Sequence, residues 1–241
     1  GGIVGGPIAL FNNIVASGSA QTMQVQWQAL APFYGFRLIY GNQGSAQTIT
    51  AAKAAVAPID LVNANTLTFS NVTFGGATTI AEPAGSGSGV DAVPAFLYSD
   101  YITTPYTART DNPSRNPLVQ TLTYYAGTFN YHSAVNAVSQ FRTAPGWDIG
   151  AKLTAGDAVT TPTGAPTTSG GIFIPSGVEF LYAETVTTVA EVGDSLARGQ
   201  ESSSGTNGWR ALSERVCTIK GPRWSPMSFA VTGQTHAASY R

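Results

Sequence analysis

Apolar and polar residues alternate in short runs through most of the chain, from about residue 21 to residue 184, as they do in half-buried β-strands. In the run 22–28, the alternation places Met23, Val25 and Trp27 on one face of an extended segment. Runs of similar character cover residues 36–40, 54–59, 66–74, 95–98, 119–125 and 177–182. Turn-forming Gly, Pro and Asn residues separate these runs. The pattern predicts a mainly β fold, a sandwich of antiparallel sheets with jelly-roll-like connections.

The pattern changes after residue 184. Residues 187–192 form a short apolar run rich in β-branched side chains, and this run ends abruptly at Gly193, Asp194 and Ser195. Gly193 allows a sharp backbone turn, and the side chains of Asp194 and Ser195 can hydrogen-bond to nearby backbone groups. We interpret the stretch as a buried parallel strand that presents a hydroxyl group at the carboxyl edge of an α/β sheet.

A helix and a second strand are predicted to follow. Residues 205–220 start with a capping residue, Thr206 or Asn207, and end before a Gly-Pro pair. One face of this helix would carry the apolar side chains of Trp209, Leu212, Val216 and Ile219. The apolar run 227–231 then leads to Gly233. Since strand, helix and strand follow one another, we expect a βαβ unit in which runs 187–194 and 227–231 are parallel neighbours.

Two blocks of this region carry a family resemblance. The first is Val192-Gly193-Asp194-Ser195-Leu196, with Gly199 behind it, and the second is Phe229-Ala230-Val231-Thr232-Gly233-Gln234-Thr235. In this order around a helix, they resemble the first two blocks of the GDSL, or SGNH, hydrolases, which have a three-layer α/β domain. The resemblance implies that Ser195 is the nucleophile and that the amides of Ser195 and Gly233 form the oxyanion hole. Gly193 and Asp194 would support the turn.

The chain departs from the family in its later blocks. The third block, an Asn that adds an oxyanion donor, and the Asp-x-x-His pair that activates the serine are not found. No Asp in the chain is followed three residues later by His. We therefore expect the catalytic base, and the rest of the hydrolase domain, to come from polypeptide after Arg241 or, as a second alternative, from a partner chain.

Composition and charge limit the kinds of binding partner and cofactor that the sequence predicts. Only 10% of the residues are charged and the net charge is −1, so nothing in the charge favours nucleic acid or an anionic membrane as a partner. This low charge content favours a protein of the extracellular space or of a particle or cell surface. No apolar run reaches transmembrane length. Two His and one Cys, far apart in the sequence, predict neither a metal site nor another cofactor, and the sequence leaves a homo-oligomer open.

Other residues invite weaker functional interpretations. The segments around Asp100 and around Arg109 and Asp111 combine polar and aromatic residues, as a carbohydrate-contacting surface does, although loop capping is the simpler explanation. His132 is interpreted as a surface or interior histidine, and His236 as part of a helix start or pocket lining, rather than as catalytic bases.

The sequence therefore predicts two domains, an accessory β-sandwich over residues 1–184 and the start of an SGNH hydrolase domain over residues 185–241. The expected function is a serine ester hydrolase whose substrate is an ester or an O-acylated carbohydrate. The alternative is a non-enzymatic glycan-binding or structural protein, of a virion or cell surface, that keeps a hydrolase remnant. Reaction of Ser195 with a fluorophosphonate distinguishes the two.

Overall fold

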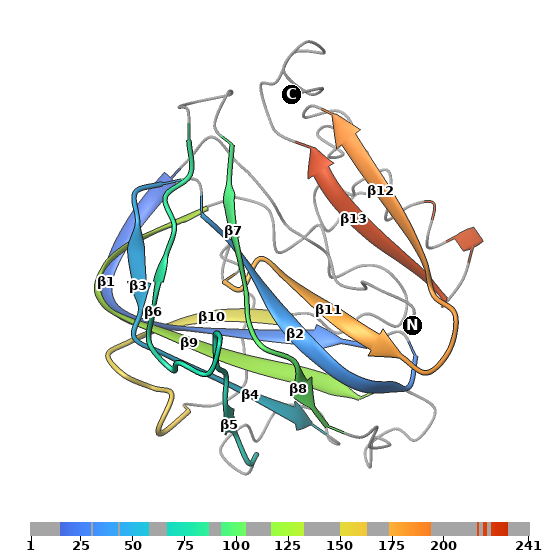
Figure 1. Cartoon of the computed structure of the whole chain (residues 1–241), viewed down its shortest axis with the longest axis horizontal. Coiled ribbons are helices and arrows are strands. Elements are labelled where there is room, and N and C mark those ends of the chain that lie inside the picture. Colours follow the sequence, from blue (N-terminus) through green and yellow to red (C-terminus); the bar gives the residue numbers. More distant parts are fainter. Residues whose placement is uncertain are drawn as a thin grey trace, which may run out of the picture.

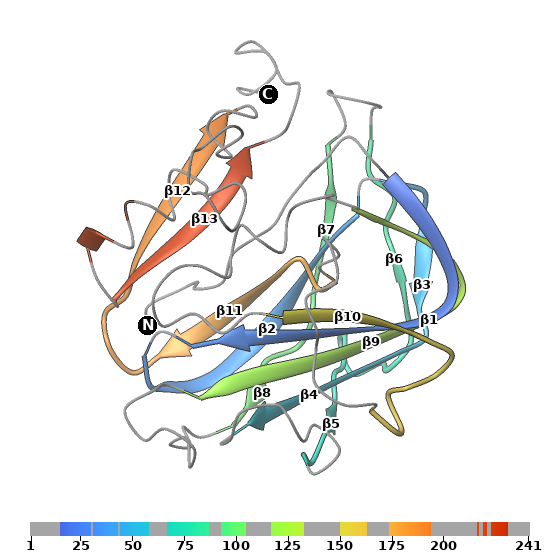
Figure 2. The same cartoon turned by 180° about the vertical axis from the view of Figure 1, so that it is seen from behind.

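The structure is a computed structural model of the chain (Figures 1 and 2). It describes residues 15–29, 31–42, 44–57, 67–86, 93–104, 117–132, 150–162, 174–193, 216, 219–220 and 223–230. This part of the chain is mainly β, and its larger sheets are antiparallel. The mainly β class expected from the sequence is therefore confirmed. The jelly-roll connections, the hydrolase domain and the domain boundary at residue 184 stay predictions.

The largest sheet has five strands in the order β10-β1-β9-β4-β5. Their bounds are Val15–Gln28 for β1, Ala51–Ala57 for β4, Ser70–Asn71 for β5, Leu118–His132 for β9 and Gly150–Ala155 for β10. Strands β1 and β9 pair along almost their whole length, from Val15 opposite His132 to Gln28 opposite Leu118. This long central pair positions the rest of the sheet.

The second sheet has four strands, β11, β2 and β7 in that order, with β8 also paired to β2. The bounds are Phe33–Asn42 for β2, Ala95–Tyr98 for β7, Ile102–Thr103 for β8 and Gly177–Tyr182 for β11. A short two-stranded ribbon joins β3, Gln47–Ile49, to β6, Ile80–Glu82. All of these pairs are antiparallel.

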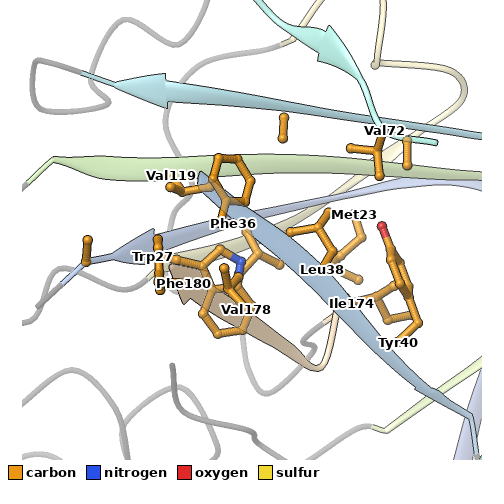
Figure 3. Close-up of a cluster of buried hydrophobic side chains, with 14 of the residues drawn as sticks. Met23, Trp27, Phe36, Leu38, Tyr40, Val72, Val119, Ile174, Val178 and Phe180 are labelled. Atoms are coloured by element: carbon orange, nitrogen blue, oxygen red, sulfur yellow. The ribbon is translucent and has the colours of Figure 1, made fainter. Parts of the chain in front are cut away.

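One hydrophobic core lies between the five-stranded and four-stranded sheets (Figure 3). Met23, Val25 and Trp27 of β1 are buried in it, as the alternation predicted. From the opposite sheet, Phe36, Leu38 and Tyr40 of β2 and Phe180 of β11 are also buried in it. Each such side chain contributes about 1.5–3 kcal/mol by leaving water. The two sheets are also joined by a hydrogen bond, 3.1 Å long, between the hydroxyls of Tyr40 and Thr123.

The predicted strands agree with the observed ones to different degrees. The run 177–182 coincides with β11 and the run 95–98 with β7. Of the run 66–74, the structure describes residues 67–74, which form a strand at Ser70–Asn71 and an isolated bridge from Phe74 to Ala77. Gly75 and Gly76, both with positive φ, form the turn inside that bridge. Strands β3, β6, β8 and β10 were not expected from the pattern.

The last two strands form a separate parallel pair. Strand β12, Thr187–Gly193, and strand β13, Trp224–Ala230, lie side by side in Figures 1 and 2 and point in the same direction. The change from antiparallel to parallel pairing occurs at the place in the chain where the sequence pattern changes.

Candidate active site

The candidate site lies at one end of the parallel pair of strands β12 and β13. The pairing runs in parallel from Thr187 opposite Trp224 to Gly193 opposite Ala230. At the start of the pair, the Thr187 N–H donates to the carbonyl oxygen of Arg223 over 2.9 Å. Both strands therefore end level with each other. The parallel neighbours expected from the sequence are confirmed.

Local contacts at the start of the two strands are weak by comparison with this backbone ladder. The guanidinium of Arg223 lies 2.8 Å from the carboxylate of Glu184, and both side chains are well exposed. Such an exposed pair contributes between zero and about 1 kcal/mol. The ammonium of Lys220 lies 5.6 Å from the centre of the Trp224 ring, within the range of a cation–π contact. Val216, Ile219 and Lys220 have helical backbone, but the described residues form no continuous helix, so the helix over 205–220 stays a prediction. Ile219, expected on its apolar face, keeps 84% of its surface.

The expectation of a buried strand is wrong for β12. Thr187, Ala190 and Val192 are exposed, and Val192 keeps 57% of its surface. The physical reason is the small size of the sheet, since among the described residues β12 pairs with β13 alone. A parallel sheet is buried only where other layers cover its faces. The β-branched composition thus predicted the strand but not its environment.

Gly193 is the last residue of β12, so the predicted turn follows a strand end. Asp194, Ser195 and Gly233 lie outside the described residues. In the sequence, Ser195 is two residues beyond Gly193, and Gly233 is three residues beyond Ala230. A residue spans at most about 3.6 Å. Neighbouring strands lie about 4.8 Å apart, so Gly193 and Ala230, the last residues of β12 and β13, lie next to each other at one end of the pair.

The structure describes His132 but not the other histidine or the segment around Arg109 and Asp111. His132 ends β9, where its backbone pairs with Val15 in the five-stranded sheet. His236, Arg109 and Asp111 lie outside the described residues, as does the single cysteine of the chain, Cys217.

Asp100 has the structural role that the sequence favoured. Its carboxylate accepts the Thr73 hydroxyl over 2.7 Å and the backbone N–H groups of Gly75 and Gly76 over 2.9 and 2.8 Å. The bond from Thr73, followed by those from Gly76 and Gly75, lowers the pKa of this carboxyl. Loop capping is therefore confirmed for Asp100.

A buried carboxylate was missed by the sequence analysis. Glu82 on β6 is 2% exposed, and its Oε2 accepts the Gln47 Nε2–H and the Tyr125 hydroxyl, each over 2.9 Å. Burial raises the pKa of Glu82, and the two hydrogen bonds oppose this shift without cancelling it. The tyrosine ring is itself stacked on Phe129, with 4.4 Å between ring centres. These contacts fill the surroundings of the carboxylate and indicate a structural role.

A second cluster was also missed, an ion pair between Arg37 and Glu179 that lies against tyrosine rings on the four-stranded sheet. The sequence analysis predicted a strand over residues 36–40 and assigned no role to Arg37.

Within the described residues, there is no group of three or more His, Cys, Asp and Glu side chains that could hold a metal ion. The described residues contain no helix that is long and apolar enough to cross a membrane. No family model and no curated protein matches the sequence. The resemblance to the SGNH hydrolases therefore rests on the two sequence blocks alone.

Proposed function

We propose that this chain carries the nucleophile and the oxyanion donors of a GDSL-type serine ester hydrolase, at the carboxyl ends of β12 and β13. The observation that supports this most is the register, which sets Gly193 level with Ala230 in a parallel pair. Parallel strands of α/β proteins bind their ligands outside their carboxyl ends. The segments that hold Ser195 and Gly233 both start from that edge.

The reaction assigns a separate task to each group. Ser195 Oγ attacks the acyl carbonyl carbon, and its proton passes to a base while the carbonyl oxygen becomes an oxyanion. The N–H groups of Ser195 and Gly233 donate hydrogen bonds to this oxyanion. Collapse of the intermediate expels the alcohol, which takes up the proton. Water then attacks the acyl-serine in the same way and releases the acid. The base for Ser195 belongs to polypeptide outside the described residues.

The proposed substrate is an O-acyl group on a polysaccharide, and the proposed location is outside the cell or on a particle or cell surface. Two features support this choice. The chain is unusually poor in charged residues, and the antiparallel sheet that precedes the parallel pair exposes the aromatic rings of Tyr98 and Tyr101.

Fluorophosphonate labelling of the full-length polypeptide that contains residues 1–241 tests the proposal. We expect one adduct by intact mass, located on Ser195 by peptide mapping, and hydrolysis of 4-nitrophenyl acetate. Ser195→Ala should abolish the adduct and lower the hydrolysis rate by several orders of magnitude, as removal of a nucleophile does. Circular dichroism and the melting temperature should stay unchanged.

Ser70→Ala is the matched control, because it removes an exposed hydroxyl from β5, well away from the parallel pair in Figure 1. It should keep full labelling and activity. Labelling at another residue, no labelling at all, or activity of Ser195→Ala within tenfold of the wild type would each overturn the proposal.

A further inference from the structure

The outer face of the four-stranded sheet carries an ordered polar and aromatic cluster. In β2, Phe36, Leu38 and Tyr40 point into the core, so Arg37 between them faces outward. The register brings Glu179 of β11 opposite Arg37. On the other side, Tyr98 of β7 stands opposite Ile39, two residues further along β2. These residues therefore share one face of the sheet.

Direct contacts hold the cluster together. The Nη2 and Nε groups of Arg37 donate to Glu179 Oε2 over 2.8 and 3.1 Å. The guanidinium carbon lies 4.7 Å from the centre of the Tyr98 ring and 4.9 Å from that of Tyr101. The Tyr101 hydroxyl donates to Glu179 Oε1. Both tyrosine rings are thus fixed to one ion pair, and the charges of that pair cancel.

The strand β8 that follows Tyr101 comes unusually close to β2. A Cβ added at Gly35 would lie 2.8 Å from the carbonyl oxygen of Ile102, a distance that real Cβ atoms essentially never show. Only glycine at this position lets β8 pair with β2 here. This close approach positions Tyr101 beside Arg37.

Aromatic side chains near Arg37 on this face remain partly open to solvent. Phe96, Tyr98 and Tyr101 keep 38, 46 and 41% of their surface. Phe96 and Tyr98 are two residues apart on β7, so they lie on one face of the strand, about 7 Å apart. Phe96 is opposite Gly41 in the register, and Tyr98 is opposite Ile39. We call Phe96, Tyr98 and Tyr101, together with Arg37, the aromatic platform.

We infer that the aromatic platform binds a neutral saccharide chain. Exposed aromatic faces are apolar, and the C–H faces of a pyranose ring stack on such surfaces while its hydroxyl groups need polar partners at the edge. Arg37 supplies them, because a guanidinium has five N–H donors, of which Glu179 engages those of Nε and Nη2. Its side chain is 30% exposed between the two tyrosines.

The charge of the aromatic platform argues against anionic ligands. An anionic ligand, such as an acidic peptide or a uronic-acid polymer, would need an uncompensated cation, but the guanidinium is neutralised by Glu179 at 2.8 Å. The nearby carboxylate of Asp100 is engaged by the turn at Gly75 and Gly76. A neutral ligand brings no further charge that must be removed from water, and its hydroxyl groups can form hydrogen bonds with Arg37.

Affinity electrophoresis of the purified chain tests this inference. The native gels contain one polysaccharide each: dextran, yeast mannan, xylan, galactan or, as the anionic comparison, polygalacturonate. We expect retardation in at least one neutral gel and none in polygalacturonate. In the retarding gel, Tyr98→Ala and Phe96→Ala should weaken binding about tenfold or more, as truncation of an aromatic anchor does.

Three controls make the result specific. Tyr98→Phe keeps the ring and should keep binding. Tyr124→Ala removes a partly buried tyrosine from the other, five-stranded sheet and should also keep it. Ser195→Ala should bind as the wild type does, since the platform does not depend on the proposed hydrolysis. No retardation in any neutral gel, stronger retardation by polygalacturonate, or unchanged binding by Tyr98→Ala would each overturn the inference.

Discussion

Replacement of Glu82 by glutamine should make the protein more stable at neutral pH. Glu82 is 2% exposed, and burial raises the pKa of its carboxyl above the ordinary value of 4.5. The folded state therefore holds this proton at pH values where the unfolded chain has released it. The carboxyl favours folding at low pH, and this advantage is lost as the pH rises from about 4.5 through the folded-state pKa. Glutamine carries no charge and avoids the loss.

The structure sets the size of the effect. Within the titration window, wild-type stability falls by up to about 1.4 kcal/mol for each pH unit. The side-chain oxygen of glutamine can still accept the hydrogen bonds from Gln47 and Tyr125, now as neutral bonds of about 0.5–1.5 kcal/mol each. Burial also raises the pKa of Tyr125 well above 10, so its hydroxyl stays a donor throughout. The charge is thus the main difference between the two proteins.

Urea unfolding between pH 4 and pH 8 measures this difference. The free energy of unfolding of Glu82→Gln should approach the wild-type value near pH 4 and exceed it increasingly as the pH rises. Glu184→Gln, which removes one negative charge at an exposed position, is the control for net charge and should not show this rise. Parallel curves for Glu82→Gln and wild type, or a variant that becomes relatively less stable as pH rises, would refute the reasoning.

Two further variants test the surroundings of the aromatic platform. Asp100→Ala should speed hydrogen exchange at the amides of Gly75 and Gly76, because it removes the acceptor of both hydrogen bonds. In the wild type, the protection of these two amides should be lost as the pH falls below about 3.8 and through the lowered pKa of Asp100. Unchanged exchange in the variant would contradict the capping role. Gly35→Ala should lower the free energy of unfolding by about 1–3 kcal/mol in urea and weaken saccharide binding, since β8 must move away from the new methyl group. Gly127→Ala, where an added Cβ meets nothing within 4 Å, should change stability by less than about 0.5 kcal/mol, and an equal loss in both variants would show that the clash at Ile102 does not matter.

The sequence predicted local structure where the pattern itself carries the information. Alternation around Trp27 identified the inward face of β1, and the β-branched run after residue 186 identified β12. The pairing partners were beyond its reach, because β1 pairs with β9 and β10, more than 80 residues further along the chain. Such pairs are selected by the packing of the whole core and leave no local signal.

Alternation also failed to predict which outer faces are covered. Gln24, Gln26 and Gln120 lie on the face of the five-stranded sheet that points away from the shared core, and all three are nevertheless buried. Gln120 has no hydrogen-bond partner for either side-chain polar atom among the described residues. A period of two separates the faces of a strand, but it does not report whether a second layer lies on the polar face.

The two proposed sites differ in how sequence information reaches them. The candidate nucleophile could be proposed from the sequence because a strand, a turn, a predicted helix and a second strand follow one another in the chain, and this order predicts two parallel neighbouring strands. The register that sets Gly193 opposite Ala230 came from the structure. The aromatic rings of the platform lie close together in the sequence, in the segment around Asp100, but its ion pair has no local signature, since Arg37 and Glu179 are 142 positions apart and meet only after β2 and β11 have paired. The ligand preference of the platform also depends on the neutralisation of Arg37 by Glu179, which lies 2.8 Å away. Without this carboxylate, an arginine beside tyrosines would favour an anion. A charge that the sequence shows as a cation is therefore, in the folded protein, half of a neutral pair, and the ligand it favours changes accordingly.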